Sequence, residues 1–192
     1  MRDKWRAAIG IDASRAVTMQ RTGTEHYSAS LLRALAALPS AQIRPIVLYV
    51  NLRDVHEARD GLPFALPNAW RVQAIPFPRL WTHVRLSAEM VVHRPETLFV
   101  PSHVVPVLHP RKTVVTIHDL GYLAYPLAHT RLSRLYLHLS TWFSTRSASR
   151  VIAISQATKR DLIKHYKVPA RKISVIYHGR DAIFQRVLDE SA

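Results

Sequence analysis

Residues 113–119 read TVVTIHD, and this stretch decides the fold predicted for the whole chain. The residues from Thr113 to Ile117 are all β-branched, which is typical of a strand buried on both faces. His118 and Asp119 follow directly, so two titratable side chains stand just beyond a buried strand. In an open parallel sheet, the groups that contact a ligand lie in loops beyond the carboxyl ends of strands. The stretch therefore predicts a functional site at the end of this strand.

Similar short apolar stretches recur along the chain and alternate with longer segments of helical apolar spacing. Strands are expected over residues 7–13, 43–50, 70–76, 96–101, 112–119, 150–155 and 172–178. Helices are expected over residues 25–38, 79–93, 129–148 and 156–167. The turn-rich segment 51–68 is left unassigned. This alternation predicts an α/β fold, a Rossmann-like open, mostly parallel sheet with helices on both faces, in one domain over residues 1–192.

Single residues predict where some elements begin and end. Thr24 is expected to cap the first helix, and Pro39 is expected to end it. Ser155 is expected to cap the helix that starts at residue 156. The stretch 70–76 alternates apolar and polar residues, which favours a strand at the edge of the sheet.

Loops beyond four strands are expected to open on the same edge of the sheet and to form one cleft. Their polar side chains are therefore the candidate acceptor or cleft residues: Asp12, Ser102, His103, Asp119, Tyr122 and Ser155, with His118 among them as the candidate catalytic group. An imidazole there can exchange protons with a ligand near neutral pH, or it can simply bind a neighbouring carbonyl. Asp119 can orient that imidazole or cap the next turn, and capping is the favoured role.

The sequence RTGTEHY, residues 21–27, places Gly23 just before a helix. Free N–H groups at a helix start can bind phosphate, and a glycine lets the ligand approach the backbone closely. The phosphate-loop pattern GxxxxGK[ST] and the dinucleotide fingerprint GxGxxG are both absent, so an ordinary loop glycine stays open as an alternative. Neither HExxH nor the hydrolase pattern GxSxG occurs, and no metal site is expected.

Composition adds a strong positive charge to this picture. The 192 residues contain 27 Lys and Arg against 13 Asp and Glu, which gives a net charge of +14, and they contain no cysteine. Such a surface attracts polyanions or anionic lipid, or balances an acidic partner domain. The basic residues are scattered, so no specific nucleic-acid partner is expected. The lack of cysteine fits a reducing compartment such as the cytoplasm.

Aromatic residues in the segment 129–148 have two interpretations. Tyr136, Trp142 and Phe143 lie at helical spacing, which is more often a core pattern than a surface one. They also stand beside arginines that suit a stripe facing an anionic membrane: Arg131, Arg134 and Arg146. Trp5, Arg79 and Trp81 are expected to be exposed and to favour the same contact, at the inner face of a membrane.

Taken together, the motifs resemble the N-terminal domain of retaining glycosyltransferases of the GT-B fold, the group called glycosyltransferase family 4. IGIDAS and RTGTEHYSASLLRAL resemble the family's first strand, glycine loop and helix. TLFVPSHVVPVLHPRKTVVTIHDLGYLAYP resembles the stretch through its His-Asp loop. The segment 134–181, which includes RVIAISQATKRDL and ends in YHGRD, resembles the end of that domain.

The resemblance implies transfer of a sugar from a nucleotide-sugar donor to an acceptor with retention of configuration, without a metal or other cofactor. It implies that this half binds the acceptor, which is a sugar, a lipid or another molecule. It maps the donor-phosphate loop to Gly23 and Thr24, places His118 near the transferred sugar and puts Ser155 near the cleft. Two positions depart from the family pattern: Glu25 stands where many members have a second glycine, and His178 stands where many have asparagine.

The printed chain ends at Ala192 without a second α/β domain, so the nucleotide-binding half is expected to be absent and the domain alone to be inactive. One alternative is a basic α/β module that binds a polyanion or a membrane surface without catalysis. A second alternative is a complete small nucleotide-binding enzyme, against which the missing glycine fingerprint argues.

Overall fold

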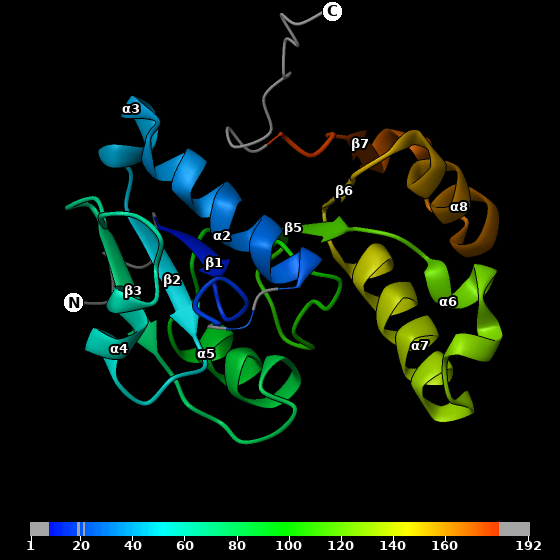
Figure 1. The fold of residues 1–192 in the computed structure, drawn as a ribbon, viewed down its shortest axis with the longest axis horizontal. Coiled ribbons are helices and arrows are strands. Elements are labelled where there is room, and N and C mark those ends of the chain that lie inside the picture. Colours follow the sequence, from blue (N-terminus) through cyan, green and yellow to red (C-terminus); the bar gives the residue numbers. More distant parts are fainter. Residues whose placement is uncertain (1–7, 19, 21, 181–192) are drawn as a thin grey trace, which may run out of the picture.

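The computed structural model describes residues 8–18, 20 and 22–180. Their strands form one seven-stranded sheet in which every neighbouring pair is parallel, in the order β3-β2-β1-β4-β5-β6-β7 (Figure 1). The strands are β1 (Ile9–Asp12), β2 (Ile46–Val50), β3 (Trp70–Ala74), β4 (Thr97–Val100), β5 (Lys112–Ile117), β6 (Arg150–Ala153) and β7 (Ile173–Val175). Each predicted strand is present, and the stretch predicted as an edge strand is β3, which forms one edge of the sheet.

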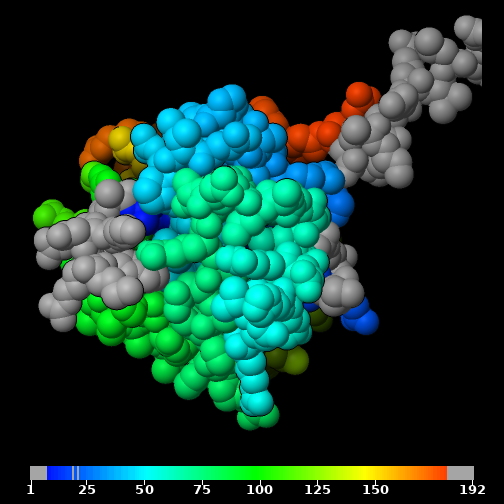
Figure 2. All heavy atoms as spheres, turned by 90° about the vertical axis from the view of Figure 1, so that its left-hand side faces the viewer, coloured from blue at the N-terminus to red at the C-terminus, as the bar shows by residue number. Residues whose placement is uncertain are grey.

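Helices connect the strands and cover both faces, which confirms the predicted open α/β sheet. They are α2 (Gly23–Ala36), α3 (Pro39–Gln42), α4 (Val55–Asp60), η1 (Thr82–Leu86), α5 (Ser87–Val92), α6 (Gly121–Ala124), η2 (Pro126–Ala128), α7 (Arg131–Ser147), α8 (Gln156–Tyr166) and η3 (Ala170–Lys172). Figure 1 shows α2, α3 and α4 grouped around β1 to β3, and α6, α7 and α8 around β5 to β7. Seen from the edge that β3 forms, the molecule presents a surface built from the segments around α3, α4 and β3 (Figure 2).

Two apolar clusters hold these layers together, one on each face of the sheet. On one face, Leu48 from β2 packs in the same cluster as Leu32 from α2. On the other face, Tyr49 from β2 belongs to the cluster that contains Met90 from α5 and Leu162 from α8. Successive residues of β2 thus enter opposite clusters, as the two-residue period of a strand requires. A strand that is buried on both faces reads as a continuous apolar run, which is why IVLYV was recognisable.

The reversal of strand order lies between β1 and β4. From β1 the chain moves outward to β2 and β3, then returns to place β4 on the other side of β1. In doubly wound sheets the ligand crevice lies at this switch point, outside the carboxyl ends of the strands. The topology therefore predicts a ligand crevice at the loops that follow β1 and β4.

Some predicted boundaries are wrong, and each has a local reason. Thr22, not Thr24, is the N-cap of α2, because Thr22 and Glu25 form a capping box that starts the helix at Gly23. Pro39 follows α2 as predicted, but it also occupies the first position of α3, where its missing N–H is not needed. The segment left unassigned contains the six-residue helix α4.

Trp81 is also a corrected prediction. Its side chain is only 6% exposed, and its Nε1–H donates to the carbonyl of Ile75 at 2.7 Å. Arg79 is exposed as expected, and Trp5 lies outside the described residues. Across the described part of the chain, no helix has both the length and the apolar character required to cross a bilayer.

Gly10 in β1 is required by close packing, and this generates a test of the fold. A Cβ at position 10 would lie 2.8 Å from Cε2 of Tyr49 and 2.9 Å from Cγ of Pro95. We expect Gly10→Ala to lower the free energy of unfolding by about 1–3 kcal/mol, because overpacking a dense core forces neighbours to move. Urea unfolding followed by circular dichroism measures this change.

The matched control is Gly23→Ala, because a Cβ there meets no atom within 4 Å. We expect this variant to remain within about 0.5 kcal/mol of the wild type. Equal stability of the two variants would contradict the described packing of β1 against β2.

Candidate functional site

A cleft of about 440 Å³ opens at the carboxyl edge of the sheet, beside the switch point. Loops after β1, β4 and β5 line it, together with the start of α2 and parts of η1 and α7. Six candidate residues predicted from the sequence line this cleft: Asp12, Thr24, Ser102, His103, Asp119 and Tyr122. Gly23, His118 and Ser155 are not among the residues that line it. Three of the four predicted loops therefore meet in one cleft.

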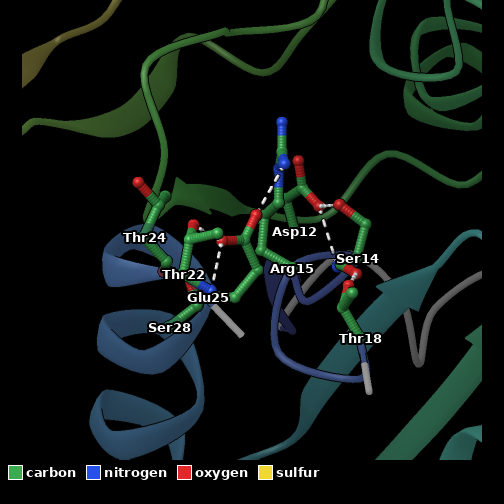
Figure 3. A network of polar contacts seen from close by, with 8 residues as sticks. All are labelled: Asp12, Ser14, Arg15, Thr18, Thr22, Thr24, Glu25 and Ser28. Atoms are coloured by element: carbon green, nitrogen blue, oxygen red, sulfur yellow. Dashed lines mark hydrogen bonds and ion pairs between the residues drawn. The ribbon is translucent and has the colours of Figure 1, made fainter. Parts of the chain in front are cut away.

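The loop after β1 is held to the start of α2 by a polar network (Figure 3). Asp12 is buried, and its Oδ1 accepts hydrogen bonds from the amide and hydroxyl of Ser14, at 3.1 and 2.6 Å. Burial raises the pKa of the Asp12 carboxyl, although the hydrogen bonds from Ser14 act in the opposite direction. Arg15, from the same loop, forms an ion pair with Glu25 of α2 at 2.7 Å.

Glu25 links the helix cap to this network. Its carboxylate accepts from the amide of Thr22 at 3.2 Å and from the Thr22 hydroxyl, while Arg15 binds its other oxygen. Burial pushes the pKa of Glu25 upward, but the hydrogen bonds from Thr22 and Arg15 outweigh that effect and hold the pKa below its usual range. A carboxylate at a helix start also interacts favourably with the helix dipole. Glu25 is thus an ionised structural residue at the cleft.

His118 lies behind the cleft, in a cluster of aromatic rings. It is 6% exposed, and its Nε2–H donates to the carbonyl of Pro101 at 3.0 Å. Its ring centre lies 4.8 Å from that of Tyr27, 5.5 Å from that of His103 and 5.6 Å from that of His178. Tyr27 belongs to the first turns of α2, so His118 packs against the helix that begins at Gly23.

The protonation state of His118 follows from these contacts. Burial lowers its pKa, and the partial effect of the Pro101 carbonyl is too small to reverse that shift. A carbonyl oxygen can only accept a hydrogen bond, so the proton of neutral His118 resides on Nε2. Nδ1 has no hydrogen-bond partner among the described residues and is therefore an acceptor site. Burial also lowers the pKa of His103 and His178.

The carboxylate of Asp119 accepts a hydrogen bond from the backbone and not from the imidazole of His118. Its Oδ1 accepts from the amide of Gly121 at 2.8 Å, which stabilises the turn into α6 and agrees with the predicted capping role. Its backbone carbonyl accepts from Nε2–H of His103 at 3.0 Å. The loops after β4 and β5 are joined by this bond, because His103 belongs to one and Asp119 to the other.

Ser155 and Tyr122 direct their hydroxyls into the structure. The Ser155 hydroxyl accepts from the amide of Thr158 at 3.0 Å, which confirms that Ser155 caps α8. The Thr158 hydroxyl in turn donates to the carbonyl of His118 at 3.0 Å, so this cap supports the backbone at His118. The Tyr122 hydroxyl donates to Thr141 at 3.0 Å. Tyr122 therefore offers its ring rather than its hydroxyl to the cleft.

The cleft lining also includes residues that were not predicted from the sequence, among them Arg15, Glu25, His129 and Tyr136. The capping-box pattern Thr-x-x-Glu at residues 22–25 was a usable signal for Glu25. No local pattern marks the others, since their position depends on how the loop after β1 and helix α7 pack. Among the described residues, no three His, Asp or Glu side chains gather in an arrangement that could hold a metal ion.

Comparison with known proteins identifies the relatives of this chain. Residues 21–183 match Glycosyltransferase Family 4, which is most of the sequence. The chain is also 30% identical over 77 residues to the O-antigen chain mannosyltransferase RfbU of Salmonella typhimurium. That second match covers 40% of this chain and 21% of RfbU, so it concerns only a small part of the relative.

The ring cluster around His118 predicts how stability depends on pH. The folded-state pKa values of His103, His118 and His178 lie below the ordinary value of 6.5, so the unfolded chain binds protons more readily than the folded one. Above about pH 6.5 the histidines are neutral in both states and protonation does not affect stability. The free energy of unfolding falls as the pH drops from about 6.5 toward the folded-state values. Urea unfolding between about pH 7.5 and pH 5 measures this loss.

The double variant with His103→Gln and His118→Gln should lose much of that dependence. Glutamine can still donate to the carbonyls of Pro101 and Asp119 but does not titrate. An identical loss of stability in the wild type and the double variant would contradict the described burial of these rings.

Proposed function

Because the chain belongs to Glycosyltransferase Family 4, we propose that it forms the acceptor-binding half of a retaining glycosyltransferase. This enzyme would transfer a sugar from a nucleotide-sugar donor to an acceptor. The observation that carries the proposal is the cleft at the switch point, which three predicted loops build together. The partial similarity to RfbU, an O-antigen chain mannosyltransferase, supports sugar transfer as the class of reaction.

The acceptor would lie in the cleft among groups that suit sugar hydroxyls. Carboxylate, hydroxyl and imidazole side chains line it, including Asp12, Ser102 and His103. Tyr122 and Tyr136 add ring surface, and aromatic rings give a flat apolar platform beside polar groups. These features support a saccharide-bearing acceptor and leave its identity open.

The donor diphosphate would contact the amino end of α2. The capping box uses the amides of Thr22 and Glu25. The amides of Gly23 and Thr24 remain at the open end of the helix, where the dipole favours a negative group. Gly23 is exposed and its missing Cβ leaves open space, so a phosphate can approach the backbone there. Glu25 need not leave Arg15 for this contact to form.

His118 would act on the transferred sugar. A neutral imidazole with Nε2–H fixed on Pro101 presents Nδ1 as a hydrogen-bond acceptor for a sugar hydroxyl. The fixed ring is pre-oriented, so little rotational entropy is lost when the sugar binds. Tyr27, His103 and His178 surround this ring and would shape the access to it.

The other components of the reaction are part of the same proposal. A second lobe would grip the nucleotide, and the 192 residues alone would bind the acceptor without turning over the donor. The reaction would need no metal or other cofactor and would take place in the cytoplasm, at the inner face of a membrane. The absence of cysteine is compatible with that reducing compartment.

The decisive experiment is His118→Ala in a polypeptide that carries both lobes. We expect the transfer rate to fall about 100-fold or more, which is the usual scale for losing a positioned acid–base or hydrogen-bonding side chain. Transfer of labelled sugar from donor to acceptor measures the rate, and the thermal unfolding midpoint checks the fold. The matched control is Glu96→Gln, whose exposed side chain pairs with Lys112 near the amino ends of the strands, away from the cleft.

In the same assay, Gly23→Ala should raise the KM for the donor while its fold stays unchanged. Near-wild-type transfer by His118→Ala would remove His118 from the reaction. If Glu96→Gln lowered the transfer rate as much as His118→Ala, the loss would reflect a general disturbance of the fold and not the removal of a group that acts in the reaction.

A further inference from the structure

Helix α7 buries polar side chains and exposes large apolar ones, which is the reverse of an ordinary surface helix. The residues it buries are Ser140, Thr141, Ser144 and Thr145. The large apolar side chains point outward instead: Leu132, Leu135, Tyr136, Leu139 and Trp142, which are between 46% and 81% exposed. Their spacing places them along one side of the helix, opposite the buried hydroxyls. An exposed apolar stripe of this length marks a contact surface.

The buried hydroxyls fix this orientation of the helix. Ser144 accepts a hydrogen bond from the amide of Val105 at 3.0 Å, and Thr141 accepts one from the hydroxyl of Tyr122 at 3.0 Å. The hydroxyl of Thr145 donates to the carbonyl of Thr141 at 2.8 Å. Rotating the helix to bury its leucines would leave these polar groups without partners, which is costly in a protein interior. The apolar stripe is therefore held outward by the packing itself.

The segment before α7 extends the same surface. Tyr125 is 74% exposed and Leu127 is 99% exposed, and α7 begins only four residues after Leu127. Residues 124 and 125 and 127–136 are all exposed, so this part of the chain projects from the domain. We call these two residues and the outward stripe of α7 the outer face.

The segment that carries the outer face contains basic residues and no acidic ones. Residues 120–160 contain six Lys or Arg and no Asp or Glu. Arg131, Arg134 and Arg146 are exposed, and no acidic side chain among the described residues forms an ion pair with them. The guanidinium of Arg146 lies 5.7 Å from the centre of the Trp142 ring. Leucine, tryptophan and arginine on one helix surface are typical of helices that lie in the headgroup region of a bilayer.

We propose that the outer face binds the surface of an anionic membrane. Leucines and Trp142 would enter the boundary between headgroups and acyl chains, while the arginines bind lipid phosphates. An uncharged partner would leave the arginines unpaired, and a second copy of this basic surface would repel the first. An anionic bilayer satisfies both the apolar and the charged component.

The placement has a consequence for the cleft. Tyr136 and Leu137 of α7 line it, and His83 beside it contacts the Tyr136 hydroxyl at 3.1 Å. A domain that rests on the outer face would therefore hold the cleft next to the lipid headgroups. The inference concerns binding alone and does not depend on the proposed sugar transfer.

Vesicle co-sedimentation of the 192-residue chain tests the proposal. The probes are vesicles of phosphatidylcholine with about 30% phosphatidylglycerol and vesicles of phosphatidylcholine alone, at about 0.15 M salt. We expect binding to the anionic vesicles only, weakened by added salt. Arg131→Glu with Arg134→Glu should weaken it by at least about 30-fold, since each basic residue near an anionic surface contributes about 1 kcal/mol.

Leu132→Ser with Leu135→Ser should weaken vesicle binding by at least about tenfold through lost apolar burial. The matched controls lie around α3 and α4, away from α7. They are Arg53→Glu with Arg59→Glu, which gives the same change in net charge, and Leu38→Ser with Ile43→Ser, which removes exposed apolar side chains 48% and 83% exposed. Both controls should bind as the wild type does. All substituted residues are exposed, and circular dichroism checks that the variants fold.

A second measurement reports the contact directly. Brominated lipids should quench tryptophan fluorescence on binding. In a chain that carries Trp5→Phe, the further change Trp142→Phe should remove most of that quenching, because Trp70 and Trp81 are buried. Wild-type binding by both outer-face variants would overturn the proposal, as would equal loss in the controls. The proposal would also be wrong if the chain did not bind anionic vesicles and formed a dimer through α7 instead. Loss of that dimer in the variant with Leu132→Ser and Leu135→Ser would identify this outcome.

Discussion

The parallel direction of all seven strands is the constraint on which the candidate site depends. Because every neighbouring pair of the seven described strands is parallel, these strands all end at the same edge of the sheet. Residues separated by more than 100 positions in the sequence, such as Asp12 and Asp119, therefore line one cleft. The reversal of strand order between β1 and β4 leaves room for that cleft, since the connecting helices depart in opposite directions there.

A small set of polar contacts then fixes the loops on this framework. The ion pair between Arg15 and Glu25 joins the loop after β1 to α2, and the bond from His103 to the Asp119 carbonyl joins the loops after β4 and β5. Glu25 acts here as a helix cap and ion-pair partner. The site thus combines loops that polar contacts join with an exposed helix start, which is the arrangement that the proposed binding of a sugar beside a phosphate requires.

The sequence was sufficient for the sheet and for much of the cleft, because parallel strands produce continuous apolar runs and their ends are easy to locate. It failed at α2, where Thr24 was chosen as the cap although the pattern Thr-x-x-Glu marked Thr22. The prediction that Trp81 is exposed was wrong, since no local sequence pattern shows that its ring packs into the core. The sequence could not show that His118 lies behind His103, because that depends on how three loops pack. The sequence also left open which side of α7 is exposed, because the burial of Ser140 and Ser144 depends on hydrogen-bond partners in other segments.

The central claim is that the loops at the carboxyl edge form one ligand site, and amide chemical shifts measure this most directly. The ¹⁵N-labelled chain would be titrated with methyl α-mannoside as a saccharide probe and with inorganic pyrophosphate as a donor-phosphate probe. The account predicts saccharide shifts at Ser102, His103 and Asp119, and pyrophosphate shifts at Gly23 and Thr24. Shifts that gather instead at the groove between Met90 and Leu108, with none at the carboxyl edge, would contradict it.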